Sequence, residues 1–148
     1  MNNAVIVGAV RTAVGKKNGK LAGVRPDDLL ADTLKALVER VKIDPREVED
    51  VVMGCVDQVG EQGFNIARNA ALIAGFPVDV CGTTLDRMCG SGQQAANFAA
   101  MNALIETSGF LISSAIRATT WVSSWSCSAP RRSWASSRCA VMYPAKNG

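Results

Sequence analysis

The sequence contains no histidine, so a common metal ligand and general base is absent from this chain. We therefore expect no metal site. The five cysteines include no Cys-x-x-Cys pair, and their odd number does not fit a complete disulfide framework. The apolar run at residues 4–10 is short and has no basic residue before it, unlike a signal peptide. A reduced, cytoplasmic location is the simplest prediction.

No stretch of the chain is apolar for long enough to span a membrane. Residues 88–105 lack charge, but they carry several hydroxyl and amide side chains: Ser91, Gln93, Gln94, Asn97 and Asn102. We therefore expect no membrane partner.

Acidic residues are absent after Glu106. The first 106 residues hold 11 basic and 13 acidic side chains, whereas the rest hold five basic and no acidic ones. The net charge of +3 therefore combines two different compositions, and it does not indicate nucleic-acid binding. Residues 107–148 also contain all three tryptophans and ten serines, without a sustained helical or strand period.

These compositions predict a globular region at residues 1–106 and an atypical tail at 107–148. Our hypothesis is that a frameshift lies near residues 105–108, and that the tail was never selected to fold and is poorly ordered. The alternative is a genuine basic, serine-rich tail that binds an acidic partner.

In the first region, hydrophobic periodicity predicts strands that alternate with helices. The expected strands are residues 4–10, 49–56 and 78–85, and the expected helices are 26–41, 65–75 and 90–105, with one helical turn after Asp44. We expect the first strand to be buried, and the alanine-rich last helix to be central and buried. This order indicates an α/β fold with a mixed or parallel sheet.

Individual residues mark these elements. Pro26 suits the first position of the helix at residues 26–41. Asn65 suits the N-cap position of the helix at residues 65–75, and Gly75 suits its C-terminal stop. Cys81 is expected in the core, and Arg68 on the surface or in a packing role. The lysines and arginines of residues 11–25 form either a solvated loop or a site for the phosphates of a coenzyme A ligand.

Residues 86–92 (Asp-Arg-Met-Cys-Gly-Ser-Gly) place Cys89 between a predicted strand and a predicted helix. The first amides of a helix lack partners and carry partial positive charge, which favours the nucleophilic thiolate. The nearby glycines leave room for a substrate, and free amides could hold an oxyanion. A structural cysteine in a glycine-rich turn is the other interpretation of the same spacing.

Residues 87–95 (Arg-Met-Cys-Gly-Ser-Gly-Gln-Gln-Ala) resemble the acylated-cysteine motif of thiolases. Residues 4–15, 50–56 and 65–75 resemble the family's opening strand with its Arg-Thr turn, a later strand and the helix before the nucleophile's strand. The resemblance covers residues 3 to about 105. It implies a truncated, thiolase-like N-terminal half-domain of α/β class, a layered sheet with a buried central helix.

The resemblance also implies a reaction, acyl transfer between a 3-ketoacyl-CoA and coenzyme A through an acyl-cysteine intermediate, as in fatty-acid β-oxidation. Cys89 would be the acyl-accepting nucleophile. Coenzyme A would be a co-substrate, with no covalently bound cofactor. The family implies a homo-oligomer, a dimer or a tetramer.

The chain departs from the family after the cysteine motif. It has no Gly-His-Pro motif, no Cys-x-Gly-Gly-Gly motif, no Asn-Glu-Ala-Phe segment and no Gly-Gly pair. Without this acid–base and oxyanion machinery, we expect the chain alone to be inactive. The alternatives are a non-catalytic dimerisation or binding module, and a relative of 3-ketoacyl synthases.

Overall fold

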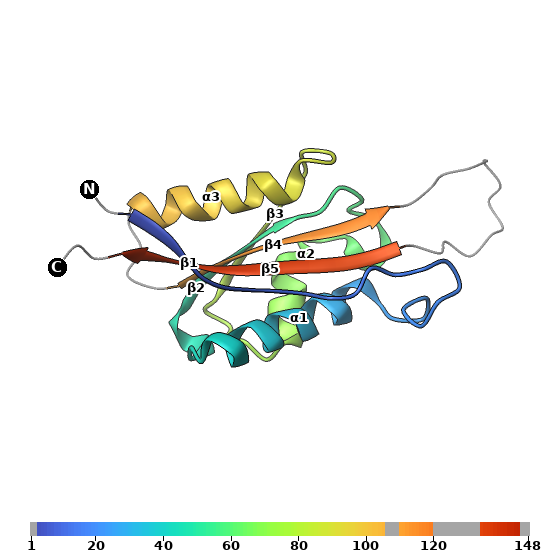
Figure 1. The fold of residues 1–148 in the computed structure, drawn as a ribbon, viewed down its shortest axis with the longest axis horizontal. Helices are drawn as coiled ribbons and strands as arrows, with labels where there is room; N and C mark the ends of the chain where they lie inside the picture. Colours follow the sequence, from blue (N-terminus) through green and yellow to red (C-terminus); the bar gives the residue numbers. More distant parts are fainter. Residues whose placement is uncertain (1–2, 106–109, 120–133, 146–148) are drawn as a thin grey trace.

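The computed structural model describes residues 3–105, 110–119 and 134–145 (Figure 1). In chain order its elements are β1 Asn3–Arg11, α1 Pro26–Val41, η1 Pro45–Glu47, β2 Val48–Gly54, η2 Gly60–Gln62, α2 Ile66–Ile73, β3 Cys81–Leu85, α3 Ser91–Ile105, β4 Phe110–Thr119 and β5 Trp134–Ala145, where η marks a single turn of 3-10 helix. The predicted alternation of strands and helices up to residue 105 is confirmed.

The five strands form one mixed sheet in the order β1-β5-β4-β2-β3. β2 is parallel to β3 and β4, whereas β5 is antiparallel to β4 and β1. It follows that β1, β2, β3 and β4 run in one direction and only β5 opposes them. The carboxyl ends of these four strands therefore lie at the same end of the sheet, where α/β proteins often bind ligands.

Helices cover both faces of the sheet. α3 lies on one face, and α1 and α2 lie on the other (Figure 1). The side chains of β2 alternate between the two layers, as a strand requires. Val51 and Met53 belong to the larger core cluster with α1 and α2, whereas Val52 packs with the alanines of α3.

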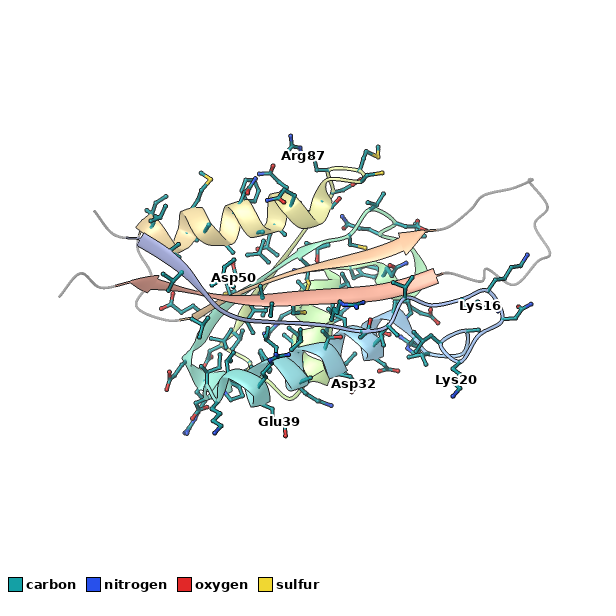
Figure 2. The ribbon with its side chains drawn as sticks, in the orientation of Figure 1. Lys16, Lys20, Asp32, Glu39, Asp50 and Arg87 are labelled. Carbon is teal, nitrogen blue, oxygen red and sulfur yellow. The ribbon has the colours of Figure 1, made fainter. Side chains whose placement is uncertain are left out.

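The amphipathic helix α1 has the bounds that its sequence predicts. Leu30, Leu34 and Leu37 are fully buried against the sheet. Asp32 and Glu39 point away from the sheet into solvent (Figure 2). Burial of these three leucines therefore stabilises the packing of α1 on this face of the sheet.

The predicted N-cap of α2 is also confirmed, because the Asn65 side chain accepts a hydrogen bond from the Arg68 amide. After the helix, Gly75 has a φ of 83°, a conformation that glycine adopts without strain. Arg68 has the predicted packing role, since its guanidinium donates to the carbonyls of Val78 and Val80.

The third strand differs from its prediction. It begins at Cys81 rather than at residue 78, because the Val80 amide closes a turn onto the Pro77 carbonyl. Cys81 was expected in the core, and this is wrong: its side chain is exposed. β3 forms an edge of the sheet, and a residue at the start of an edge strand has few neighbours to cover it.

Two further burial predictions are corrected. β1 is not a buried strand: it forms the other edge of the sheet, and Ile6 is 67% exposed. α3 buries only the narrow stripe of Ser91, Ala95, Ala99 and Ala103. Its apolar side chains Phe98 and Met101 are exposed, since small residues alone face the sheet. The helix lies on the sheet and is not enclosed on all sides.

The region beyond residue 106 holds two strands where the sequence predicted poor order. β4 lies between β2 and β5, and β5 joins β1 to the rest of the sheet. Both segments contain apolar runs, at residues 110–112 and 139–143, that suit a strand. Ile112 and Cys139 are buried in the larger core cluster. Residues 106–109, 120–133 and 146–148 lie outside the described part of the chain, and the frameshift stays a prediction.

Candidate active site

The predicted nucleophile lies in the turn that connects β3 to α3. Cys89 is exposed, and α3 begins two residues later at Ser91. The turn follows the carboxyl end of β3, which lies at the same end of the sheet as the carboxyl end of β2. The structure therefore confirms the strand-to-helix placement of Cys89, whereas its acyl-accepting role stays a prediction.

Side-chain oxygens from Asp86 and Ser91 hold this turn together. The Ser91 hydroxyl accepts from the Arg87 amide at 2.8 Å and lies 2.7 Å from the Met88 carbonyl, to which it can donate. The Asp86 Oδ1 atom accepts from the Met88 amide at 2.7 Å and lies 3.3 Å from the Ser91 hydroxyl. Ser91 is only 3% exposed. Four hydrogen-bonding contacts therefore surround the backbone just before Cys89.

The backbone of the turn is tightly wound. Met88 has a φ of 47°, in the left-handed region that a non-glycine side chain rarely adopts. The Gly90 amide donates to the Arg87 carbonyl at 2.9 Å, and the Ser91 amide donates to the Met88 carbonyl at 3.1 Å. The Arg87 side chain points away from the sheet and donates to Gln94 on α3 (Figure 2).

A glycine on β2 sets how closely the helix approaches the sheet. A Cβ atom placed on Gly54 would lie 2.3 Å from the backbone carbon of Ser91 and 2.5 Å from the Gly92 nitrogen. Such contacts are impossible, so the start of α3 can rest on the end of β2 only because residue 54 has no side chain. Gly54 thereby fixes the position of the turn that holds Cys89.

The neighbouring thiol of Cys55 has a different environment from Cys89. Cys55 is 1% exposed, and its Sγ lies 3.7 Å from the Asp57 carbonyl and 3.8 Å from Gln62 Oε1. Burial raises the pKa of the Cys55 thiol to about 11. Cys55 therefore stays protonated at neutral pH and is unsuited to be a nucleophile.

The basic loop after β1 and the Cys89 turn lie at the same end of the strands, because β1 and β3 run in the same direction, although the two strands form opposite edges of the sheet. Lys16 and Lys20 extend from this loop into solvent (Figure 2). Arg25 is engaged elsewhere, since its guanidinium lies 2.6 Å from the Asp27 carboxylate. Burial alone would raise the pKa of Asp27, but the hydrogen bonds and charge of Arg25 outweigh it and hold that pKa below its ordinary value.

The described ranges hold no group of three or more residues that could ligate a metal ion. Among the helices described, none has the length and apolar character needed to cross a membrane. Cys139 is buried on β5, and Cys127 lies outside the described residues. A cytoplasmic location stays a prediction.

Sequence reasoning found Cys89 but missed three residues that shape its turn, Asp86, Ser91 and Gly54. Ser91 had a usable signal, since a hydroxyl at the start of a helix often bonds back to the preceding turn. Gly54 had only the weak signal of a glycine at the end of an apolar strand. The role of Gly54 depends on the packing of β2 against α3, which the residues around Gly54 do not predict.

The residues from β1 to the start of β4 match a known family. The family model for the thiolase N-terminal domain matches residues 4–112. The chain therefore belongs to the thiolase family. The fold agrees, because a crystal structure of acetyl-CoA acetyltransferase from Bacillus anthracis superposes with a TM-score of 0.72 and 33% identity, over 89% of this chain and 36% of that one.

Two curated relatives that match the chain over part of their own length are also thiolases. The steroid 3-ketoacyl-CoA thiolase FadA6 of Mycobacterium tuberculosis is 46% identical over 117 residues, which are 79% of this chain and 29% of the relative. A 3-ketoacyl-CoA thiolase of Psychrobacter cryohalolentis is 52% identical over 99 residues, or 66% of this chain and 25% of the relative. The chain thus spans about a quarter of the length of these curated relatives.

Proposed function

We propose that this chain carries the acyl-accepting half of a thiolase-type site, with Cys89 as the nucleophile. The observation that carries the proposal is the exposed Cys89 thiol on a braced turn at the start of α3. The substrate class is an acyl-CoA, and a 3-ketoacyl-CoA in the degradative direction. Lys16 and Lys20 are candidates for contacts with the coenzyme A phosphates, because their loop begins at the same end of the strands as the Cys89 turn.

The chemistry is a thioester exchange. The Cys89 thiolate attacks the carbonyl carbon of the acyl-CoA, and a new carbon–sulfur bond forms as the bond to the coenzyme A sulfur breaks. Coenzyme A leaves as a thiolate and takes up a proton from solvent. In the degradative direction the thiolate attacks the keto carbon, the bond between the α and β carbons breaks, and acetyl-CoA leaves after protonation.

The direct test is acylation without turnover. The chain is incubated with acetyl-CoA, and the acetyl group is located by peptide mass spectrometry. We expect the adduct on Cys89 and not on Cys81, which is also exposed and serves as an internal control. An unmodified Cys89, or equal modification of both thiols, would contradict the proposal.

Complete turnover is not expected of this chain. A histidine base is missing from the whole sequence, and general acid–base assistance contributes about 10²–10⁴-fold to such reactions. We expect thiolytic cleavage of acetoacetyl-CoA to be no faster than in a Cys89→Ala variant. A clear excess over that control would show that other groups replace the missing ones.

A second candidate function is a non-catalytic dimerisation or binding module. Two observations favour it: β3 is an edge strand of the sheet that the described residues form, and the outer side of α3 exposes Phe98, Met101 and Leu104. An open edge can pair with another strand, and an apolar helix face can pack on a partner. A homo-oligomer, as in the family, would use such surfaces.

Size-exclusion chromatography tests the second candidate. The chain is applied alone and together with a full-length thiolase. Co-elution that a Phe98→Gln, Met101→Gln variant loses would support the module, whereas a monomer under both conditions would exclude it at the concentrations used. Because acylation of Cys89 is measured separately, the two candidate functions are tested independently.

A further inference from the structure

We propose that Ser91 and Asp86 are positioning residues for Cys89: their side-chain oxygens lock the turn at residues 86–91 and so fix where the Cys89 thiol is presented. The inference rests on the proposed function for its catalytic consequence. Neither side chain needs to touch a substrate, because both act on the backbone that precedes the thiol.

The first step of the argument is the burial of Ser91. Its side chain is almost completely enclosed, and its oxygen contacts the Arg87 amide and the Met88 carbonyl, the two residues before Cys89. If the buried hydroxyl rotated away, the Arg87 amide would lose its bond, and the Met88 carbonyl would keep only its bond from the Ser91 amide. Ser91 therefore ties the first turn of α3 to the connection from β3.

The second step is the conformation of Met88. Its positive φ is unfavourable for a residue with a flexible apolar side chain, and Met88 is 70% exposed, so packing does not compensate. The Asp86 carboxylate accepts from the Met88 amide, and the Ser91 hydroxyl contacts the Met88 carbonyl. Both peptide groups of this strained residue are thus held by side chains. Without them, Met88 is expected to relax and to rotate the Cys89 backbone.

The third step is that no other described side chain performs this task. The Arg87 guanidinium bonds Gln94 on the outside of α3, and the Cys89 thiol has no hydrogen-bond partner in the described part of the chain. The backbone of the turn therefore sets the position of the Cys89 Cβ atom, from which the thiol reaches a substrate. A displacement of about 1 Å at a reacting group can reduce a rate by about a hundredfold, so a brace of this kind would matter to acyl transfer.

The test compares Ser91→Ala, Asp86→Ala and Ser91→Thr with the unchanged chain. Asn97→Ala is the matched control, since Asn97 lies on the exposed side of the same helix and, among the described residues, accepts from Gln93 alone. Two NMR readouts report on the turn itself, amide hydrogen exchange at Arg87 and Met88 and the order parameter of the Cys89 amide. A third readout is the rate of Cys89 acetylation as a function of acetyl-CoA concentration.

We expect Ser91→Ala to accelerate Arg87 exchange by about tenfold or more, and Asp86→Ala to do the same for Met88. The Cys89 order parameter should fall from about 0.85 towards the flexible range below about 0.6 in either variant. The maximal acetylation rate should fall about tenfold while the half-saturating acetyl-CoA concentration stays the same. Ser91→Thr, which keeps the hydroxyl, should restore all three values.

Unchanged exchange and order parameters in Ser91→Ala would overturn the inference, as would an equal loss of acetylation in Asn97→Ala. If the unchanged chain forms no acyl-Cys89 while the NMR readouts respond as expected, the proposed function fails and the bracing of the turn stands. If Ser91→Ala does not fold, Asp86→Ala, whose side chain is exposed, carries the same test.

Discussion

Gly54 is the residue whose side chain, or lack of one, most directly controls the Cys89 turn. We expect Gly54→Ala to lower the free energy of unfolding by about 1–3 kcal/mol, because the new methyl group overlaps the backbone of Ser91 and the start of α3 must move. Urea denaturation followed by circular dichroism measures this loss, and acetylation of Cys89 should slow in the same variant.

Gly23→Ala is the matched control for that substitution. A Cβ atom at Gly23 would meet no atom within 4 Å, so we expect a change within about 0.5 kcal/mol. If Gly54→Ala were as stable as Gly23→Ala, the close approach of β2 and α3 would be disproved.

The buried Cys55 thiol is expected to make the stability of the folded chain fall at alkaline pH. Its pKa is raised from 9.0 to about 11 in the folded chain, so the folded state keeps a proton that the unfolded chain loses first. The stabilisation from this thiol is complete below pH 9 and disappears as the pH rises through about 11. We expect the urea midpoint of the unchanged chain to fall over this window by more than that of Cys55→Ala.

Cys81→Ala serves as the comparison, since Cys81 is exposed and its removal takes no side chain out of the core. Alkylation by iodoacetamide at pH 8, resolved by peptide, gives a second check. Modification of Cys55 at the rate of Cys89 in the folded chain would contradict the burial of this thiol.

Asp50 lies half-buried on β2, and burial raises the pKa of its carboxyl group, partly offset by the bond it accepts from the Val51 amide (Figure 2). A raised pKa means that the folded chain favours the protonated form, so the carboxylate opposes folding once the pH exceeds its ordinary range. We expect Asp50→Asn to stabilise the chain at pH 7 by less than about 1 kcal/mol, because solvent screens a half-buried group. Thermal unfolding at pH 7 and pH 4 measures this, and the gain should shrink at pH 4.

At the scale of elements, α2 and β3 are joined by the side chain of Asn65. Its amide donates to the Gly82 carbonyl at 2.6 Å, and its Oδ1 atom accepts from the Thr84 hydroxyl at 2.8 Å and from the Arg68 amide at 3.4 Å. Asn65 also adopts a φ of 62°, which asparagine tolerates better than alanine. We expect Asn65→Ala to destabilise the chain by about 2–4 kcal/mol.

Asn69→Ala is the control within the same helix, because within the described part of the chain the Asn69 side chain makes a single long bond, 3.4 Å to the Gly63 carbonyl. It should change the free energy of unfolding by less than about 1 kcal/mol. Equal effects of the two substitutions would show that the cap and the bonds to β3 contribute little.

The same elements show what a sequence can and cannot predict. The bounds of α1 and the cap at Asn65 depend on local periodicity and on neighbouring residues, so the sequence predicts them well. The exposure of Cys81 and Ile6 depends on the order of strands, and the half-exposed state of α3 depends on what packs against it. The motif around Cys89 predicts that residue. The role of Gly54 was not predicted, because it acts through a contact with Ser91, 37 positions later in the chain.

At the scale of the whole molecule, the structure and the composition divide the chain differently. Composition separates residues 1–106 from 107–148, whereas the sheet places β4 between β2 and β5. Without β4 and β5, the strand β1 would have no partner among the described strands, because it pairs only with β5. The core would also lose Ile112 and Cys139.

We therefore expect a chain that ends at residue 106 to lose its cooperative unfolding transition. Truncation separates β1 from β2, removes β4 and β5, on which α3 and α1 also pack, and removes the buried side chains of Ile112 and Cys139. Together these losses are comparable to the stability of about 5–15 kcal/mol that is typical of a domain. Circular dichroism melts of residues 1–106 and 1–148 make the comparison. A 1–106 chain that melts cooperatively at the same temperature would favour the boundary drawn from composition, and would make β4 and β5 dispensable for the Cys89 turn. Loss of the transition would instead mean that the serine-rich segment completes the sheet on which that turn is built.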